Sequence, residues 1–376
     1  MNLSRVFVAN RGEIAVRVLR ACRKLELSSV IGVSEADQES TGAMMADRAI
    51  VIGPAPSKDS YLKPDLIVSA AVNSGCDALH PGYGFLSERG ELAEMCAENG
   101  IAFVGPTADT IRKVGDKISA RELARAAGVP LVPGSGEVST VEQAKSAASD
   151  VGYPIVLKAT AGGGGRGMAV ARADEDIART FDAASLEAEE AFGDGTLYVE
   201  RFVENARHVE VQILGDGKGN VLHFGDRDCS AQRRYQKVVE EAPATAVPDD
   251  IRTNMREAAV RLAKSINYRN AGTVEFLYDQ NHNAFYFIEV NARIQVEHPV
   301  TEEITGVDLV VAQLKIAAGE PLGLTQDMIA LSGHAIECRI NAEMPLRDFA
   351  PSPGRITAWL PPEGDGVRVD SHCEQG

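Results

Sequence analysis

The residues of this chain best suited to chemistry are two glutamates in neighbouring β-like segments. Residues 273–279 and 285–291 alternate apolar and polar side chains, as β-strands do, and a polar turn joins them. If this hairpin is centred on His282, Glu275 lies directly opposite Glu289. Two carboxylates that face each other across a strand pair repel unless a cation lies between them. The pattern therefore predicts a cation site.

The candidate ligands of this cation are oxygen atoms. An amide oxygen from Asn291 joins Glu275 and Glu289 on the same face, and such a set suits a hard cation such as Mg²⁺ that also holds phosphate. Two alternatives stay open: one glutamate pairs with Arg293 at the surface, or a slipped register separates the two glutamates. The opposite face is predicted to be apolar and to carry Val274, Phe276, Ile288 and Val290.

A glycine run follows a lysine near the end of an apolar segment. Lys158 lies in residues 154–159, which predict a strand, and a G-x-G-x-x-G pattern occurs within residues 161–167. Residues 168–171 predict another strand, whereas the dinucleotide-binding fingerprint requires a helix there. Glycines let backbone N–H groups approach phosphate oxygens, and a lysine on an apolar strand needs an anion. The pattern favours a hairpin lid over phosphate; the alternative is a flexible surface loop.

Residues 291–299 form a polar segment that is predicted to be extended. In that conformation Arg293, Gln295 and Glu297 alternate onto one side. An arginine can bind a small planar anion through two hydrogen bonds, and a glutamate beside it can act as a general base. The alternative is a solvated polar strand.

Two basic features lie elsewhere in this acidic chain. Residues 232–237 form a basic run that either binds an anionic substrate such as ATP or is solvated surface. Arg339 stands in a mostly apolar segment, where the alternative to a functional role is a salt bridge to Glu337 or another acid.

At least two kinds of sheet must position these residues. Residues 6–10, 13–24 and 30–34 predict strand, helix and strand, and the first ~110 residues predict an open α/β domain. The opening turn lacks G-x-G-x-x-G, which argues against a dehydrogenase. Later segments predict helices at 113–127, 173–191, 249–265 and 306–318, strands at 154–159, 168–171 and 197–201, a β-meander over 208–247 and a β-rich unit from 335.

The composition limits the class of protein. The chain has 376 residues, of which 44% are hydrophobic and 24% charged, as in a soluble globular protein. Its formal net charge of −16 would repel a phosphate backbone, so no nucleic-acid partner is predicted. No apolar stretch of about 18 residues occurs, so no membrane span is predicted. The six cysteines form no paired or zinc-ligand motif, which favours a cytoplasmic protein.

Several long motifs occur in an order that resembles one enzyme family. They occupy residues 9–15, 80–88, 162–168, 232–242 and 291–301. With these motifs the chain resembles the biotin carboxylases of acyl-CoA and pyruvate carboxylases from about residue 3 to its end. The resemblance implies an α/β and α+β fold with a Rossmann-like N-terminal domain (1–112), an ATP-grasp domain (113–326) with a glycine-rich lid (about 131–203), and an incomplete β-rich C-terminal domain (327–376).

The resemblance also implies a role for each candidate residue. Glu275, Glu289 and Asn291 are the implied ligands of Mg²⁺ or Mn²⁺, in agreement with the hairpin pattern. Arg339 is implied to stabilise the enolate of biotin. The bicarbonate pocket is implied to contain Lys237, Arg293, Gln295, the backbone of Val296, and Glu297, which is the implied base. The implied ATP contacts are Lys117, Lys158, Gly164, Gly165, Glu200, Val203, His208, Gln232, Tyr235, Glu275 and Glu289.

The implied reaction is the ATP- and bicarbonate-dependent carboxylation of biotin through carboxyphosphate. The chain has no Met-Lys-Met motif, so biotin is expected on a separate carboxyl carrier domain that also serves a carboxyltransferase. Relatives continue past Gly376, and a homodimer is implied where the C-terminal domain is complete. Tyr235 and Ala161 stand where many relatives have histidine and glycine. The alternatives are another ATP-grasp ligase, or a truncated nucleotide-binding fragment without catalysis.

Overall fold

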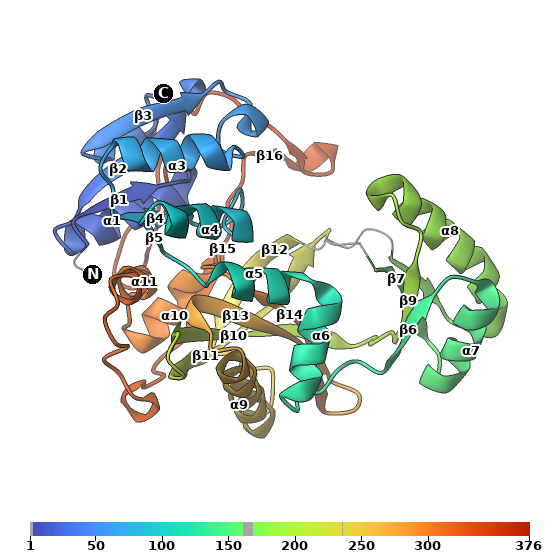
Figure 1. The fold of residues 1–376 in the computed structure, drawn as a ribbon. Helices are drawn as coiled ribbons and strands as arrows, with labels where there is room; N and C mark the ends of the chain where they lie inside the picture. The colour runs from blue at the N-terminus through green and yellow to red at the C-terminus, as the bar shows by residue number, and fades with distance from the viewer. Residues whose placement is uncertain (1–2, 161–167, 235) are drawn as a thin grey trace.

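The structure is a computed structural model that describes residues 3–160, 168–234 and 236–376. Figure 1 shows an N-terminal layer in blue, a central sheet with helices around it, and a separate group of helices and strands in green that stands to one side. None of the helices in the described ranges combines the length and the hydropathy that a membrane span requires.

The N-terminal layer is a parallel sheet with strand order β3-β2-β1-β4-β5, as the predicted open α/β domain requires. Helix α1 has a buried face of aliphatic side chains that packs on this sheet. The edge strand β3 and the short helix α2 were not predicted. The elements are β1 (Arg5–Val8), α1 (Gly12–Lys24), β2 (Ser28–Ser34), α2 (Thr41–Met45), β3 (Arg48–Gly53), α3 (Pro64–Asn73), β4 (Ala78–His80), α4 (Gly90–Glu98) and β5 (Ala102–Phe103), with single 3-10 turns at Glu35–Asp37 and Ser57–Asp59.

The carboxyl end of this sheet is covered by the chain itself. Open α/β sheets bind ligands where the strand order reverses, which here lies between β1 and β4. Asn10 crosses this point and donates to the carbonyls of Pro81 (2.7 Å) and Tyr83 (2.8 Å). His372 of the C-terminal segment lies beside Gly12, where a Cβ atom would be 3.6 Å from its ring.

Two helices occupy the segment that was predicted as one helix over residues 113–127. They are α5 (Ala108–Gly115) and α6 (Lys117–Ala126). The helical conformation is interrupted at Asp116. The carboxylate of Asp116 accepts a hydrogen bond from the backbone N–H of Ser119 (2.8 Å) and so caps α6. An aspartate that satisfies a free N–H in this way favours the start of a new helix. The prediction of one continuous helix was wrong for this reason.

The green group in Figure 1 has its own sheet, with strand order β6-β9-β7-β8, and its own hydrophobic core. We call it the lid. Strands β7 and β8 pair antiparallel, so the strand predicted after the glycine run is confirmed; the run itself, with Gly164 and Gly165, lies outside the described residues. Its elements are β6 (Gly134–Val138), α7 (Val141–Val151), β7 (Ile155–Ala159), β8 (Met168–Ala171), α8 (Asp174–Phe192) and β9 (Leu197–Arg201), of which β6 and α7 were not predicted.

The central sheet is antiparallel, with strand order β14-β13-β10-β11-β12-β15. The predicted alternation in the meander is confirmed, since Val209, Val211 and Ile213 lie in the main hydrophobic core while Glu210 and Gln212 lie on the opposite face. That face carries a set of hydrogen-bonded side chains that we call the polar cluster: Glu210, Gln212, Arg227, Lys237, Glu275, Gln295 and Glu297. The elements are β10 (Ala206–Asp216), β11 (Val221–Arg233), β12 (Gln236–Ala242), α9 (Asp249–Ser265), β13 (Arg269–Asp279), β14 (Ala284–Asn291), α10 (His298–Thr305), α11 (Leu309–Ala317) and β15 (Ala335–Cys338).

The C-terminal segment is only partly regular. β15 lies at the edge of the central sheet, where it pairs with β12, and the predicted β-rich unit continues with one short strand pair. These elements are β16 (Glu343–Met344) and β17 (Ala350–Pro351), with 3-10 turns at Gln326–Met328 and Pro345–Arg347.

Candidate functional site

The hairpin of β13 and β14 holds the two glutamates opposite each other, as predicted. The register arises differently, however. Asp279 pairs with Ala284, which places the turn centre half a residue before His282, and a β-bulge between Glu275 and Phe276 then restores the glutamate pair. A bulge displaces one residue from the alternation.

The bulge corrects the prediction for the apolar face of the hairpin. Phe287, opposite Phe276, is 2% exposed and belongs to the hydrophobic core, whereas Ile288 is only half-buried. Val274 and Val290 lie on the apolar face as expected.

The carboxylate of Glu275 is buried among hydrogen-bond donors. One oxygen accepts from Lys237 Nζ (3.0 Å), Asn291 Nδ2 (2.8 Å) and Gln295 Nε2 (3.0 Å), and the other lies 2.8 Å from His208 Nε2. Burial alone would raise the pKa of Glu275, but the charges of Lys237 and His208 hold that pKa well below its usual range. Glu275 is therefore ionised in the folded protein.

The environment of Glu289, in contrast, raises the pKa of its carboxyl group. Loss of surrounding water raises the pKa of Glu289, and the negative charge of Glu275 raises it further, although Lys117 acts against both. A cation between the two carboxylates would relieve this repulsion. The amide oxygen of Asn291, which accepts from Arg293 (2.9 Å), is the third oxygen nearby. These oxygen donors fit a hard divalent cation.

Lys237 on β12 joins three carboxylates. Its Nζ atom lies 2.5 Å from Glu210, 3.0 Å from Glu275 and 2.6 Å from Glu297. Burial would lower the pKa of Lys237, but these carboxylates raise it well above its usual value. The ammonium is therefore charged near neutral pH, and it is paired with these three carboxylates.

Arg339 on β15 completes the surroundings of Glu297. Its guanidinium donates to Glu240 (2.6 Å) and to the second oxygen of Glu297 (2.9 Å), so Glu297 lies between Lys237 and Arg339. The alternative predicted from the sequence was a salt bridge to Glu337 or another acid, and the acids that Arg339 pairs with are Glu240 and Glu297. Burial, followed by the charges of Glu240 and Glu297, raises the pKa of Glu337 to about 9.

The segment between β14 and α10 is not extended, which corrects the prediction for residues 291–299. It turns through Val296, and Glu297 is the residue that caps α10. Gln295 and Glu297 are 3% and 2% exposed and point into the polar cluster. The guanidinium of Arg293 instead donates to Glu88 (3.0 Å) and Asn291. Arg293 therefore lies at the edge of the cluster rather than beside Glu297.

The sequence analysis missed Arg227, which lies on β11 at the base of the cluster. Its side chain is fully buried and donates to Glu210, Gln212, Thr273, Gln295 and Thr301. A signal was present, because Asp226 and Asp228 flank this arginine in the middle of a predicted strand of the meander. Three consecutive charges in such a strand require buried partners.

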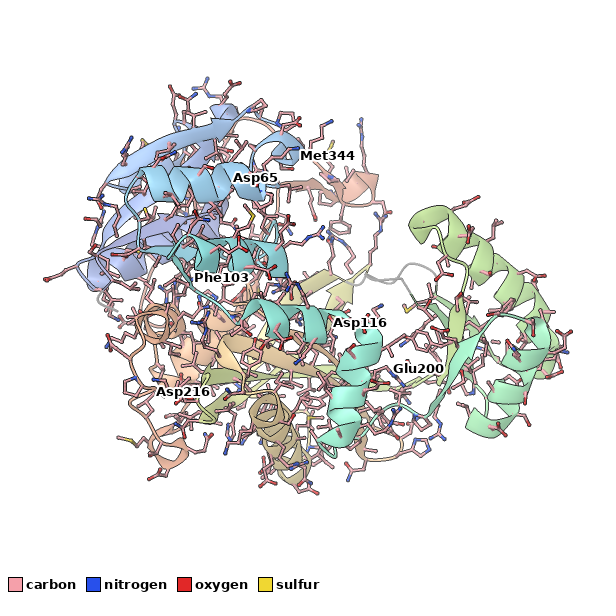
Figure 2. The ribbon with its side chains drawn as sticks, in the orientation of Figure 1. Asp65, Phe103, Asp116, Glu200, Asp216 and Met344 are labelled. Atoms are coloured by element: carbon pink, nitrogen blue, oxygen red, sulfur yellow. The ribbon has the colours of Figure 1, made fainter. Side chains whose placement is uncertain are left out.

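The lid contributes a second group of charged residues. Lys158 on β7 lies 2.5 Å from Glu200 on β9, and Arg121 on α6 also pairs with Glu200. Figure 2 shows Glu200 on the side of the lid that faces α6 and Asp116. Burial lowers the pKa of Lys117, the first residue of α6, while Glu289 raises it. The predicted contacts Lys117, Lys158 and Glu200 thus lie around the junction of the lid and α6.

The remaining predicted nucleotide contacts occupy two places. Gln232 donates to the carbonyl of Cys229 and lies 3.1 Å from His208 Nδ1, beside the polar cluster. Val203 follows β9 and lines a cavity of about 260 Å³ together with Tyr153. Tyr235 lies outside the described residues.

Comparison with known proteins gives matches over nearly the whole chain. Residues 2–111 match the family "Biotin carboxylase, N-terminal domain", residues 116–325 "Carbamoyl-phosphate synthase L chain, ATP binding domain", and residues 337–376 "Biotin carboxylase C-terminal domain". Biotin carboxylase 1 of Bacillus subtilis is 52% identical over 375 residues, which is 100% of this chain and 83% of the relative. Biotin carboxylase of Nostoc sp. is 53% identical over 373 residues, or 99% and 83% of the two chains.

Solved structures give the same result. The Campylobacter jejuni biotin carboxylase–β-γ-ATP complex superposes with a TM-score of 0.94 at 47% identity, over 100% of this chain and 83% of that one. The biotin carboxylase domain dimer of the Hydrogenobacter thermophilus 2-oxoglutarate carboxylase, in complex with MgADP, ADP and bicarbonate, gives a TM-score of 0.93 at 48% identity with the same coverage.

Proposed function

The chain belongs to the biotin carboxylase family, and from this premise we propose that it uses ATP and bicarbonate to carboxylate biotin on a carrier protein. The predicted fold class, a Rossmann-like domain followed by an ATP-grasp domain with a lid, is confirmed. Two relatives support the choice of substrates, because their structures contain a form of ATP in one case and MgADP with bicarbonate in the other.

The observation that carries this proposal is the position of Glu297. Its carboxylate is 2% exposed and lies between the ammonium of Lys237 and the guanidinium of Arg339. A base in this place can take a proton from an anion that the two cations attract. Bicarbonate is such an anion, and it carries one proton to remove.

The reaction then follows from the charges around Glu297. Glu297 accepts the proton of bicarbonate, and the resulting oxyanion attacks the terminal phosphorus of ATP, which displaces ADP and forms carboxyphosphate. Lys237 and Arg293 balance the charge that develops, while Gln295 and the backbone of Val296 orient the anion. Carboxyphosphate breaks down to carbon dioxide and phosphate. Phosphate takes a proton from a ureido nitrogen of biotin, and Arg339 stabilises the enolate that forms. The deprotonated nitrogen then attacks carbon dioxide to give carboxybiotin.

The nucleotide occupies the space between the lid and the central sheet in this proposal. Glu275, Glu289 and Asn291 would hold Mg²⁺ or Mn²⁺, which would supply positive charge beside the terminal phosphates of ATP. Lys117 and Lys158 bind phosphates or border the adenine. The other proposed contacts are Glu200, Val203, His208 and Gln232, together with Gly164, Gly165 and Tyr235, which lie outside the described residues.

The proposed assembly extends beyond the chain itself. The domains are proposed to span residues 1–112, 113–326 and 327–376. A biotin carboxyl carrier domain and a carboxyltransferase are the proposed partners, and a homodimer is the proposed oligomer, by analogy with the Hydrogenobacter thermophilus domain dimer. All six cysteines are free thiols, which supports a cytoplasmic location because oxidising compartments favour disulfides.

Phosphate release from Mg-ATP tests the proposal. We expect release to require bicarbonate and to increase when free biotin is added, with each component omitted in turn. One rival is an ATP-grasp ligase that uses ammonia, which the carbamoyl-phosphate synthase model for residues 116–325 favours. Release that depends on ammonia and ignores biotin would establish that rival. ATP binding without any release would establish a non-catalytic fragment.

A further inference from the structure

Arg227 makes four hydrogen bonds in addition to its ion pair with Glu210. It is 0% exposed, and its Nε atom donates to Glu210 (2.6 Å). Replacing a buried ion pair by apolar side chains is often neutral for stability, so stability does not by itself explain a buried arginine. The geometry of its other bonds does. They run to Gln212 (2.8 Å), Thr301 (2.9 Å), Gln295 (2.8 Å) and Thr273 (3.3 Å).

The bond to Gln295 determines how that amide is oriented. A guanidinium can only donate, so Arg227 Nη2 requires the amide oxygen of Gln295 to face it. The amide nitrogen must then point the other way, where it donates to Glu275 (3.0 Å). Arg227 and the ionised carboxylate of Glu275 therefore hold this amide between them, and without Arg227 the amide oxygen of Gln295 loses its donor.

The ion pair with Glu210 has a similar effect on Lys237. Arg227 binds one oxygen of Glu210, and the other oxygen lies 2.5 Å from Lys237 Nζ. The planar guanidinium of Arg227 therefore holds the carboxylate of Glu210 in place, and this carboxylate in turn positions the ammonium of Lys237.

The bond to Thr301 connects Arg227 to the proposed base. Thr301 lies in the first turn of α10, and Glu297 is the residue immediately before that helix. An anchor at Thr301 therefore fixes the start of α10, to which the backbone of Glu297 is directly connected. One arginine thus contacts the supports of Lys237, Gln295 and Glu297.

We propose that Arg227 is a positioning residue that holds Lys237, Gln295 and Glu297 in the arrangement that binds bicarbonate. This inference rests on the proposed function. It assigns no contact between Arg227 and substrate. It also predicts different effects on bicarbonate and on ATP, because Arg227 supports residues of the proposed bicarbonate site, whereas Glu200 of the lid pairs with Lys158 and Arg121.

The first test is Arg227→Lys, with KM measured separately for bicarbonate and for ATP. Lysine keeps the positive charge beside Glu210, but a single ammonium lacks the planar fork that reaches Gln295 and Thr301 together. We expect the KM for bicarbonate to rise roughly tenfold or more, because each lost charge-assisted bond has about that effect, while the KM for ATP stays within about twofold. A melting temperature near that of the wild type would show that the variant is folded.

The matched control is Arg256→Lys. Arg256 pairs with Asp226, which is fully buried and adjacent to Arg227 on β11. Like Arg227→Lys, this substitution replaces an arginine paired with a fully buried carboxylate, but the carboxylate of Asp226 lies outside the polar cluster. We expect it to leave both KM values unchanged. An equal rise in the KM for bicarbonate in Arg256→Lys would overturn the inference, since any disturbance of β11 would then suffice.

Thr301→Val decides the matter if Arg227→Lys does not fold. Valine has nearly the shape of threonine, so only the bond from Arg227 to α10 is lost. We expect kcat with saturating bicarbonate to fall several-fold at an unchanged KM for ATP. Unaltered bicarbonate kinetics in the folded Arg227→Lys protein, or in Thr301→Val where the former does not fold, would overturn the inference. Absence of bicarbonate-dependent phosphate release in the wild type would instead overturn the proposed function.

Discussion

At the scale of single residues, the proposed role of Glu297 as the base can be tested directly by substitution. Glu297→Gln keeps its volume but removes the base, so we expect turnover to fall roughly a hundredfold or more. Bicarbonate-dependent phosphate release measures this directly. Glu303→Gln, on the exposed side of the same helix, is the control and should retain full activity. Near-normal turnover in folded Glu297→Gln would contradict the role of Glu297 as base.

A second residue-scale prediction concerns Glu337, whose pKa is raised by burial and by Glu240 and Glu297 to about 9. Its carboxyl binds a proton more tightly in the folded chain than in the unfolded one. This contribution to stability is complete below the unfolded pKa of about 4.5 and is lost as the pH rises through about 9. Glu337→Gln stays neutral at every pH. We therefore expect it to melt above the wild type at pH 8.5 and to differ less at pH 6.

The control for this pH dependence is Glu363→Gln, which alters an exposed carboxylate of the same C-terminal segment. Its melting temperature should follow that of the wild type at both pH values. A gap between Glu337→Gln and the wild type that is the same at pH 6 and at pH 8.5 would show that the carboxyl of Glu337 is already ionised in the folded protein at both pH values.

At the scale of elements, the break between α5 and α6 connects a helix cap to nucleotide binding. Asp116 caps α6, and the next residue, Lys117, is a proposed phosphate contact. Asp116→Ala removes the cap and should destabilise the protein by about 1 kcal/mol. Because Lys117 begins the helix, we also expect the KM for ATP to rise. Asp116→Asn, which still accepts a hydrogen bond, should retain both the stability and the KM for ATP of the wild type. An unchanged KM for ATP in Asp116→Ala would show that the cap does not contribute to nucleotide binding.

The elements that the sequence predicted well are those whose signals are local. Helix α9 and the alternation of β10 were predictable because the spacing of apolar residues within each segment determines them. The break at Asp116 was missed because the apolar spacing continues across it. Residues 291–299 were predicted as extended because Arg293, Gln295 and Glu297 alternate, although Pro299 in the first turn of α10 signals a helix start.

The candidate site divides in the same way. The pairing of Glu275 with Glu289 depends on one hairpin, and it was predictable even though a bulge compensated for the misplaced turn centre. The partners of Arg227 and Arg339 lie on other strands and on α10, as far as 99 positions away in the sequence for Glu240 and Arg339. Such contacts depend on how the strands are ordered in the sheet, and spacing in the sequence carries no information about that order.

At the scale of the whole molecule, hydrophobic cores define which parts unfold together. The main core contains Phe7 and Leu79 of the N-terminal sheet as well as Val209 and Phe276 of the central sheet. The lid has its own core, which includes Ile177. The N-terminal and central sheets therefore form one cooperative unit, whereas the lid can open without exposing the main core.

Hydrogen bonds from Arg269 also join the N-terminal and central sheets. At the start of β13 it donates to the carbonyls of Phe103 (3.2 Å) and Gly105 (2.9 Å), at the end of β5; Figure 2 shows Phe103 at this junction. Bonds from a charged donor stabilise by roughly 2 kcal/mol, so we expect Arg269→Ala to lower the urea midpoint while Lys218→Ala, an exposed loss of charge, does not. Because the shared core remains, circular dichroism and amide exchange of β1 and β10 should still report one transition. Two separate transitions in Arg269→Ala would mean that these hydrogen bonds, and not the hydrophobic core, couple the two sheets.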